Sequence, residues 1–89
     1  MIKISWTNKF RKKLENYLAK YPLSKAKLME TLALFAENPN HPKLKKHKLS
    51  GKLKDSQAIA VEYDCRIVFY MPETNEAVFT NIGSHDDVY

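Results

Sequence analysis

Residues 57–71 read QAIAVEYDCRIVFYM, and this stretch decides the fold class. Apolar residues alternate with others on both sides of Tyr63-Asp64-Cys65, which is long enough only for a tight hairpin turn. The pattern predicts an antiparallel pair of strands, 57–63 and 65–71. The second strand is apolar on both faces, as is typical of a central strand. One face of the first strand is expected to carry Ile59, Val61 and Tyr63, and the other Ala58, Ala60 and Glu62.

Downstream, residues 76–82 predict a third strand, which ends at Gly83 before a short tail. The expected faces of this strand are Val78, Thr80 and Ile82 against Ala77, Phe79 and Asn81. Upstream, residues 2–6 predict a short strand in which Ile2, Ile4 and Trp6 share a face.

Two helices are predicted between the first strand and the hairpin. The first is capped by Thr7 or Asn8 and closed by Pro22, and the second is capped by Ser24 and ends at 38–40. Their apolar stripes are Phe10, Leu14, Tyr17, Leu18 and Tyr21, and Leu28, Leu32 and Phe35 widened by Met29, Ala33 and Ala36. The order β-α-α-β-β-β predicts an α+β domain in which a helical hairpin packs on one face of an antiparallel sheet. The first strand is expected at an edge or in parallel.

The chain has 89 residues, which suits one domain, 1–89. Its one cysteine, Cys65, cannot form an internal disulfide, and no apolar run approaches the roughly 18–20 residues that span a bilayer. A cytoplasmic location is therefore expected.

The charge is divided unevenly along the chain. Residues 1–54 contain 14 of the 15 basic residues and three acidic ones, whereas residues 55–89 contain one basic and seven acidic residues. A basic first half favours a polyanion or an acidic protein as partner, although lysines on helices also serve as a solvated face. The most basic segment, 39–56, is expected to be a loop with at most one helical turn, anchored by Leu44, Leu49 and Leu53. Its lysines are Lys43, Lys45, Lys46, Lys48, Lys52 and Lys54.

Phosphate-binding loops, zinc motifs and nucleophile elbows are missing from the sequence. The candidate site residues at strand ends and in loops are His47, Asp64, Arg66, His85 and Tyr89. Such a set suits RNA cleavage by a ribose 2′-OH, which needs a base, an acid and cations for the phosphoryl charge. Each residue also has an ordinary structural role: Asp64 in turn chemistry, Arg66 in an ion pair with Glu62 or Asp64, and Tyr89 in covering the sheet. A metal site built on the histidines with Cys65 is a weaker alternative.

The sequence resembles the RelE/ParE superfamily of type II toxins, most closely its YafQ-like branch of mRNA interferases. The resemblance covers nearly the whole chain. Its most specific parts are HKLSGKLK (47–54), VEYDCRIVFY (61–70) and IGSHDDVY (82–89). It implies a RelE-like fold and a small cytoplasmic endoribonuclease that cuts mRNA in the ribosomal A site without a metal or other cofactor.

The resemblance also implies a cognate antitoxin, with operator DNA bound only through the toxin–antitoxin complex and no membrane partner. His47, Asp64, His85 and Tyr89 match functional positions of the branch, and Arg66 matches a strand arginine of the superfamily. The branch can carry a further histidine where this chain has Ala60, and tryptophan where it has Cys65. The alternatives are a ParE-like gyrase inhibitor without catalysis, or an inactive relic that only binds its antitoxin.

Overall fold

The computed structural model describes residues 1–51 and 55–88. The predicted anchor Leu53 and the residues Lys52, Lys54 and Tyr89 lie outside this range. Within it, five strands form one sheet in the order β1-β5-β4-β3-β2. Their bounds are Lys3–Trp6 for β1, His47–Lys48 for β2, Gln57–Glu62 for β3, Cys65–Glu73 for β4 and Glu76–Gly83 for β5. Strand β1 is at an edge and runs parallel to β5, while the other pairs are antiparallel. The predicted α+β class and the central position of β4 are confirmed.

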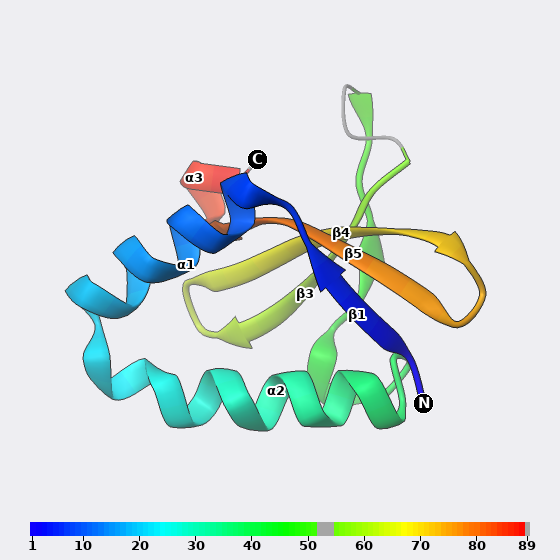
Figure 1. Cartoon of the computed structure of the whole chain (residues 1–89), viewed down its shortest axis with the longest axis horizontal. Coiled ribbons are helices and arrows are strands. Elements are labelled where there is room, and N and C mark those ends of the chain that lie inside the picture. The colour runs from blue at the N-terminus through cyan, green and yellow to red at the C-terminus, as the bar shows by residue number, and fades with distance from the viewer. Residues whose placement is uncertain (52–54, 89) are drawn as a thin grey trace.

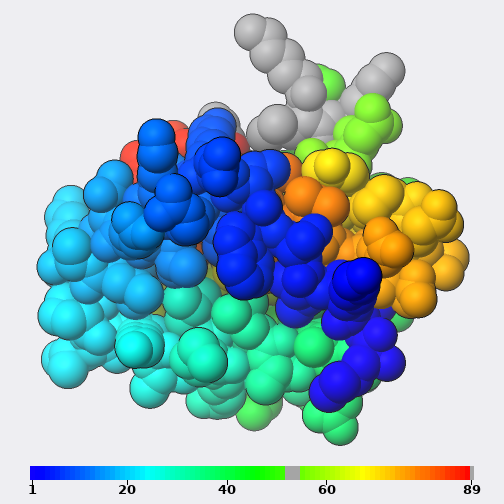
Figure 2. All heavy atoms as spheres, in the orientation of Figure 1, coloured from blue at the N-terminus to red at the C-terminus, as the bar shows by residue number. Residues whose placement is uncertain are grey.

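Helices α1 (Asn8–Lys20) and α2 (Lys25–Glu37) are joined by a 3-10 turn, Pro22–Ser24, and diverge from it as the arms of the predicted hairpin (Figure 1). Figure 2 shows that these helices and β1 together cover one face of the molecule. The Thr7 hydroxyl accepts the Phe10 N–H at 3.1 Å, so Thr7 is the predicted cap of α1. Ser24 precedes α2 but makes no capping bond, because its hydroxyl donates to Glu62 instead.

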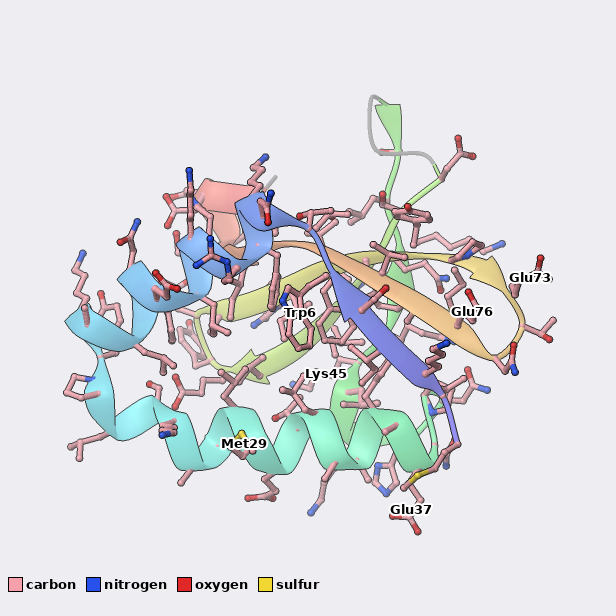
Figure 3. All side chains as sticks on the ribbon, viewed as in Figure 1. Trp6, Met29, Glu37, Lys45, Glu73 and Glu76 are labelled. Atoms are coloured by element: carbon pink, nitrogen blue, oxygen red, sulfur yellow. The ribbon has the colours of Figure 1, made fainter. Side chains whose placement is uncertain are left out.

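The core lies between the helices and the sheet. Phe35 of α2 makes edge-on contacts with Phe69 of β4 and Phe79 of β5, with ring centroids 5.0 and 5.5 Å apart. Phe10 of α1 contacts Phe79 from the other side. The rest of the buried cluster is Leu28, Leu44, Ile59, Val61, Cys65, Ile67, Ala77 and Ile82. The predicted helix stripes therefore face the core except at Tyr21, which is half-exposed, and the margin residue Met29 is also exposed. Trp6 is also 58% exposed, between α1 and α2 (Figure 3).

Two β-bulges change the faces predicted from simple alternation. In β3 the register shifts between Ala60 and Glu62, so the Glu62 side chain turns toward the helices and Tyr63 is 98% exposed. In β5 a shift at Thr80 puts Ile82 on the same face as Phe79. A bulge inserts one residue into one strand, and this reverses the side-chain direction beyond it.

Two short elements were not predicted. Strand β2 pairs with β3 inside the predicted loop, which also contains the expected helical turn at Pro42–Leu44. The segment after Gly83 is a helical turn, α3 (His85–Val88), that lies beside α1 (Figure 1). Leu44 is buried and Leu49 is half-buried, so both anchor the lysine-rich segment as expected.

Candidate active site

Asp64 and His85 are brought together at one end of the sheet. Asp64 lies in the two-residue turn between β3 and β4, and His85 begins α3 immediately after β5. The His85 backbone N–H donates to Oδ1 of Asp64 at 3.3 Å, although the residues are 21 positions apart. The turn and the segment after Gly83 therefore meet, as the sequence predicted for the tail and the hairpin.

Arg66 is the second residue of β4 after this turn, on the face away from the helices, and it lies opposite Gly83 on β5 and Ala60 on β3. Its Nη1 donates to the backbone carbonyl of Glu62 at 2.7 Å, and to those of Tyr63 and Cys65 at 3.1 Å. Arg11 pairs with Glu15 and Lys27 with Glu30, whereas Arg66 forms no ion pair with a carboxylate of the described residues. The alternative in which Arg66 pairs with Glu62 or Asp64 is therefore wrong. The guanidinium instead binds the carbonyls of the hairpin, next to the turn that carries Asp64.

A cationic groove separates this hairpin from the lysine-rich segment. It has a volume of about 270 Å³, and its walls include Lys43, Lys45, Ala60, Glu62 and Arg66. Lys45 has a left-handed backbone (φ 50°), so the chain reverses sharply there. The three cations of the groove outnumber Glu62, whose carboxylate accepts hydrogen bonds from Tyr17 and Ser24, so the groove attracts an anion such as a phosphate.

His47 lies on the same face of the sheet as Arg66. It pairs with Ala58 on β2–β3, and Ala58 pairs with Val68, two residues beyond Arg66 on β4. Directly paired residues on adjacent strands point to the same face, and two strand spacings put His47 about 10 Å across the sheet from β4. Nδ1 of His47 is 3.1 Å from the carbonyl oxygen of Lys45, which binds His47 to the wall of the groove.

The predicted RNA-binding lysines do not form one surface. Lys43 and Lys45 line the groove beside Arg66. Lys46 hydrogen-bonds to the Asn40 side chain and lines a separate hollow against the β4–β5 turn, whose residues Glu73 and Glu76 lie far from α3 (Figure 3). Lys48 pairs with Gln57, which in turn pairs with Phe69 of the core. Lys48 therefore belongs to the helix-covered face of the sheet. Lys52, Lys54 and Tyr89 lie outside the described residues.

A polar network beneath the turn fixes the hairpin to α1 and to the 3-10 turn Pro22–Ser24. The Tyr17 hydroxyl and the Ser24 hydroxyl both donate to Oε2 of Glu62, at 3.0 and 2.9 Å. Burial, together with the neighbouring Cys65 thiol, raises the pKa of Tyr17 well above its usual value. Burial likewise raises the pKa of Cys65, whose side chain is fully enclosed. Cys65 is therefore a protonated core residue with little nucleophilic character.

A larger hollow of about 670 Å³ lies on the helix side of the same turn. Its walls include Lys13, Lys20, Tyr63, Asp64, Ser84 and Asp87. Asp64 therefore lines this hollow and is not among the described residues that line the cationic groove.

Ser84 and Asp87 were missed at the sequence level. Each side chain binds the backbone N–H of the other residue, at 3.3 Å, across the start of α3. The Ser84-x-x-Asp87 spacing is a known sequence signature of a helix start and could have identified both residues.

The arrangement supplies the groups that phosphoryl-transfer chemistry requires: imidazoles and a carboxylate that can exchange protons, and cations beside them. Among the described residues there is no cluster of three or more His, Cys, Asp or Glu side chains that could hold a metal ion. In the same part of the chain, no helix is long and apolar enough to cross a membrane.

Comparison with known proteins identifies the family. Residues 2–89 match the family described as the bacterial toxin of type II toxin–antitoxin system, YafQ. Similar solved structures include YafQ from E. coli strain BL21(DE3), with a TM-score of 0.82 and 20% identity over 100% of this chain and 99% of that one. A metal-bound toxin from Helicobacter pylori has a TM-score of 0.80 and 30% identity over 100% of both chains.

YafQ in the E. coli DinJ–YafQ complex has a TM-score of 0.80 and 20% identity, over 100% of this chain and 99% of that one. Among curated proteins, no sequence matches significantly. The structures at 20% identity support the fold alone, whereas the family match spans nearly every residue, including the three segments on which the resemblance was based. The chain belongs to the YafQ family of bacterial type II toxins.

Proposed function

We propose that this toxin is a cytoplasmic endoribonuclease that cuts translated mRNA on the ribosome without a catalytic metal. The observation that carries the proposal is the contact of Asp64 with His85 at the β3–β4 hairpin, whose Arg66 lines a groove together with Lys43 and Lys45. Three separate segments contribute to it: the β3–β4 hairpin, the turn after β5 and the lysine-rich segment.

In the proposed reaction, the ribose 2′-oxygen forms a bond to the adjacent phosphorus and the bond from phosphorus to the 5′-oxygen breaks. The products are a 2′,3′-cyclic phosphate and a free 5′-hydroxyl. His85 donates a proton to the leaving 5′-oxygen, and either His47 or Asp64 accepts the 2′-OH proton or orients the group that does. Arg66 stabilises the negative charge that develops on the phosphoryl oxygens.

The contact between Asp64 and the His85 backbone favours an orienting role for Asp64, since one oxygen of its carboxylate is already engaged with an N–H. His47 then becomes the stronger candidate base, on the same face as Arg66. Ala60 lies between them, opposite Arg66. The missing histidine at this position leaves the site with fewer proton-transfer groups than the branch can carry.

Lys43 and Lys45 bind the RNA backbone in the groove, and Lys46 and Lys48 contact ribosomal or messenger RNA outside it. Lys52 and Lys54 also bind RNA. Tyr89 stacks on an unpaired base. Proximity and alignment account for a large part of the rate in such reactions, so the ribosome supplies what this sparse site lacks.

A cognate antitoxin is the expected protein partner, because similar toxin chains occur in DinJ–YafQ complexes. Its toxin-binding segment is acidic, to complement a chain of net charge +5. It covers the basic helices and either blocks the groove or displaces α3, and operator DNA is bound only by the complex.

The test is primer extension on a translated message in a reconstituted translation system, with and without ribosomes. Wild-type protein is expected to cut only with ribosomes, and His85→Ala is expected to lose the cleavage while remaining folded. Asp86→Ala changes the next exposed residue and serves as the matched control. A chelator of transition metals that spares the Mg²⁺ needed by ribosomes should leave cleavage unchanged.

Two outcomes would replace the proposal. Intact mRNA with DNA-damage signalling on induction would indicate the gyrase-inhibitor alternative. Intact mRNA and normal growth with a folded, antitoxin-binding chain would indicate the relic.

A further inference from the structure

The end of β5 is joined to α3 by a reciprocal pair of side-chain bonds. The Ser84 N–H donates to Oδ2 of Asp87, and the Asp87 N–H donates to the Ser84 hydroxyl, both at 3.3 Å. The Ser84 carbonyl also accepts the N–H groups of Asp87 at 3.0 Å and Val88 at 3.2 Å. This is a capping box in which aspartate takes the place of the usual glutamate.

His85 lies inside this box, and its position depends on it. A four-residue helix has too few internal hydrogen bonds to be stable by itself. The helix α3 is stabilised by the capping box, by the hydrogen bond from the His85 N–H to Asp64, and by the burial of Val88.

The residues around the capping box restrict its conformation. A Cβ at Gly83 would lie 2.9 Å from Cβ of Asp87, so the strand end and the helix approach too closely for a larger residue. Lys13 and Lys20 of α1 line the same 670 Å³ hollow as Asp87. Their charges and the Ser84 hydrogen bonds favour the ionised carboxylate that the box requires.

We infer that Ser84 and Asp87 are positioning residues for His85: they fix the direction in which its imidazole enters the site without contacting RNA. Applied to catalysis, this inference rests on the proposed function, in which His85 is the general acid. A misplacement of about 1 Å can cost about a hundredfold in rate, so a short cap remote from the reacting atoms can matter strongly.

The kinetic test uses ribosome-dependent cleavage by the full chain. Ser84→Ala and Asp87→Ala are each expected to lower kcat by about tenfold or more with KM nearly unchanged. Ser84→Thr keeps a capping hydroxyl and should restore kcat, and Asp86→Ala is the matched acidic control. The residual cleavage that His85→Ala retains at high protein concentration should not fall further with Ser84→Ala, since positioning acts only through the imidazole. Equal losses with and without His85 would overturn the inference.

A second measurement does not depend on cleavage. In amide hydrogen exchange followed by NMR, Asp87→Ala and Ser84→Ala should deprotect the N–H groups of Ser84, His85 and Asp87 while leaving β4 protected. Unchanged exchange at His85 in both variants would refute the positioning pair even if the wild-type protein cleaves RNA. Conversely, a wild-type protein that cuts no RNA but shows this deprotection would refute the proposed function and leave the positioning pair supported.

Discussion

The face of the sheet beneath α1 and α2 carries aromatic rings in mutual contact, whereas the opposite face carries His47, Arg66 and the partly exposed Tyr70. The same strands build both faces, because successive side chains alternate. Phe69 and Arg66 are three residues apart on β4, yet one belongs to the core and the other to the candidate site. This separation means that stability and chemistry can be altered one at a time.

The largest effect is expected from the covered face. Phe35→Ala removes a fully buried ring that contacts both Phe69 and Phe79, and it should lower the free energy of unfolding by about 3–5 kcal/mol. Urea denaturation followed by circular dichroism measures the loss. Met29→Ala, on the exposed side of the same helix, should change it by no more than about 0.5 kcal/mol. Similar losses for both variants would show that α2 does not divide into buried and exposed sides.

On the open face, a substitution should lower cleavage strongly and stability only slightly. Arg66→Lys keeps the positive charge but loses the planar set of donors, and we expect cleavage to fall about a hundredfold. The free energy of unfolding should change by only about 1 kcal/mol, for the weakened bonds to the hairpin carbonyls. Arg11→Lys is the control, since Arg11 is exposed on α1 and paired with Glu15. Full cleavage by Arg66→Lys would remove the guanidinium from the mechanism.

The groove should contribute through charge rather than through geometry. Lys43→Gln combined with Lys45→Asn removes two cations while asparagine tolerates the left-handed backbone at residue 45. Binding to ribosomes or single-stranded RNA should weaken about tenfold, and the slope of log affinity against log salt should fall by about 1.4. Lys25→Gln with Lys27→Gln on α2 makes the same change of charge away from the groove. An equal effect of the two pairs would point to net charge instead of the groove.

A smaller effect is expected at the network that joins the two faces. Tyr17→Phe deletes a donor to Glu62 and should cost about 1 kcal/mol of unfolding free energy. Tyr21→Phe, in the adjacent and half-exposed ring, should cost almost nothing. Thermal denaturation of the two variants compares them directly. If Tyr17→Phe has no cost, Glu62 is held by Ser24 and the bulge alone.

The smallest effect concerns pH. Hydrogen bonds from Ser84 lower the pKa of Asp87 below its ordinary value of 3.8. The ionised Asp87 carboxylate therefore stabilises the folded state at pH values above its ordinary pKa. This contribution disappears as the pH falls through the lower pKa that Asp87 has in the folded protein. Protection of the Ser84 amide should be constant from neutral pH to about pH 4 and decrease below it. In Asp87→Asn the protection should not follow this titration.

The sequence predicted the order of the main elements and the residues of the core. Period-3.6 stripes and period-2 alternation are local patterns, and burial of apolar side chains is strong enough to enforce them at Phe10, Phe35 and Phe69. The motifs also predicted that His47, Asp64, Arg66, His85 and Tyr89 gather at one site; of these, Asp64 and His85 are in contact, and Arg66 lies at the same end of the sheet.

Only the tertiary structure decided the direction of Glu62 and Ile82, the partners of Arg66 and the division of the lysines among three surfaces. Bulges shift a strand by one residue when non-local packing and hydrogen bonds favour it, and no local pattern marks them here. The lysine-rich segment has no hydrophobic periodicity, so its sequence does not indicate where each lysine points. Only the folded backbone puts Lys45 in the groove and Lys46 against Asn40. Local sequence thus determined which residues are apolar, basic or reactive, and the packing of distant segments decided which of them share a surface.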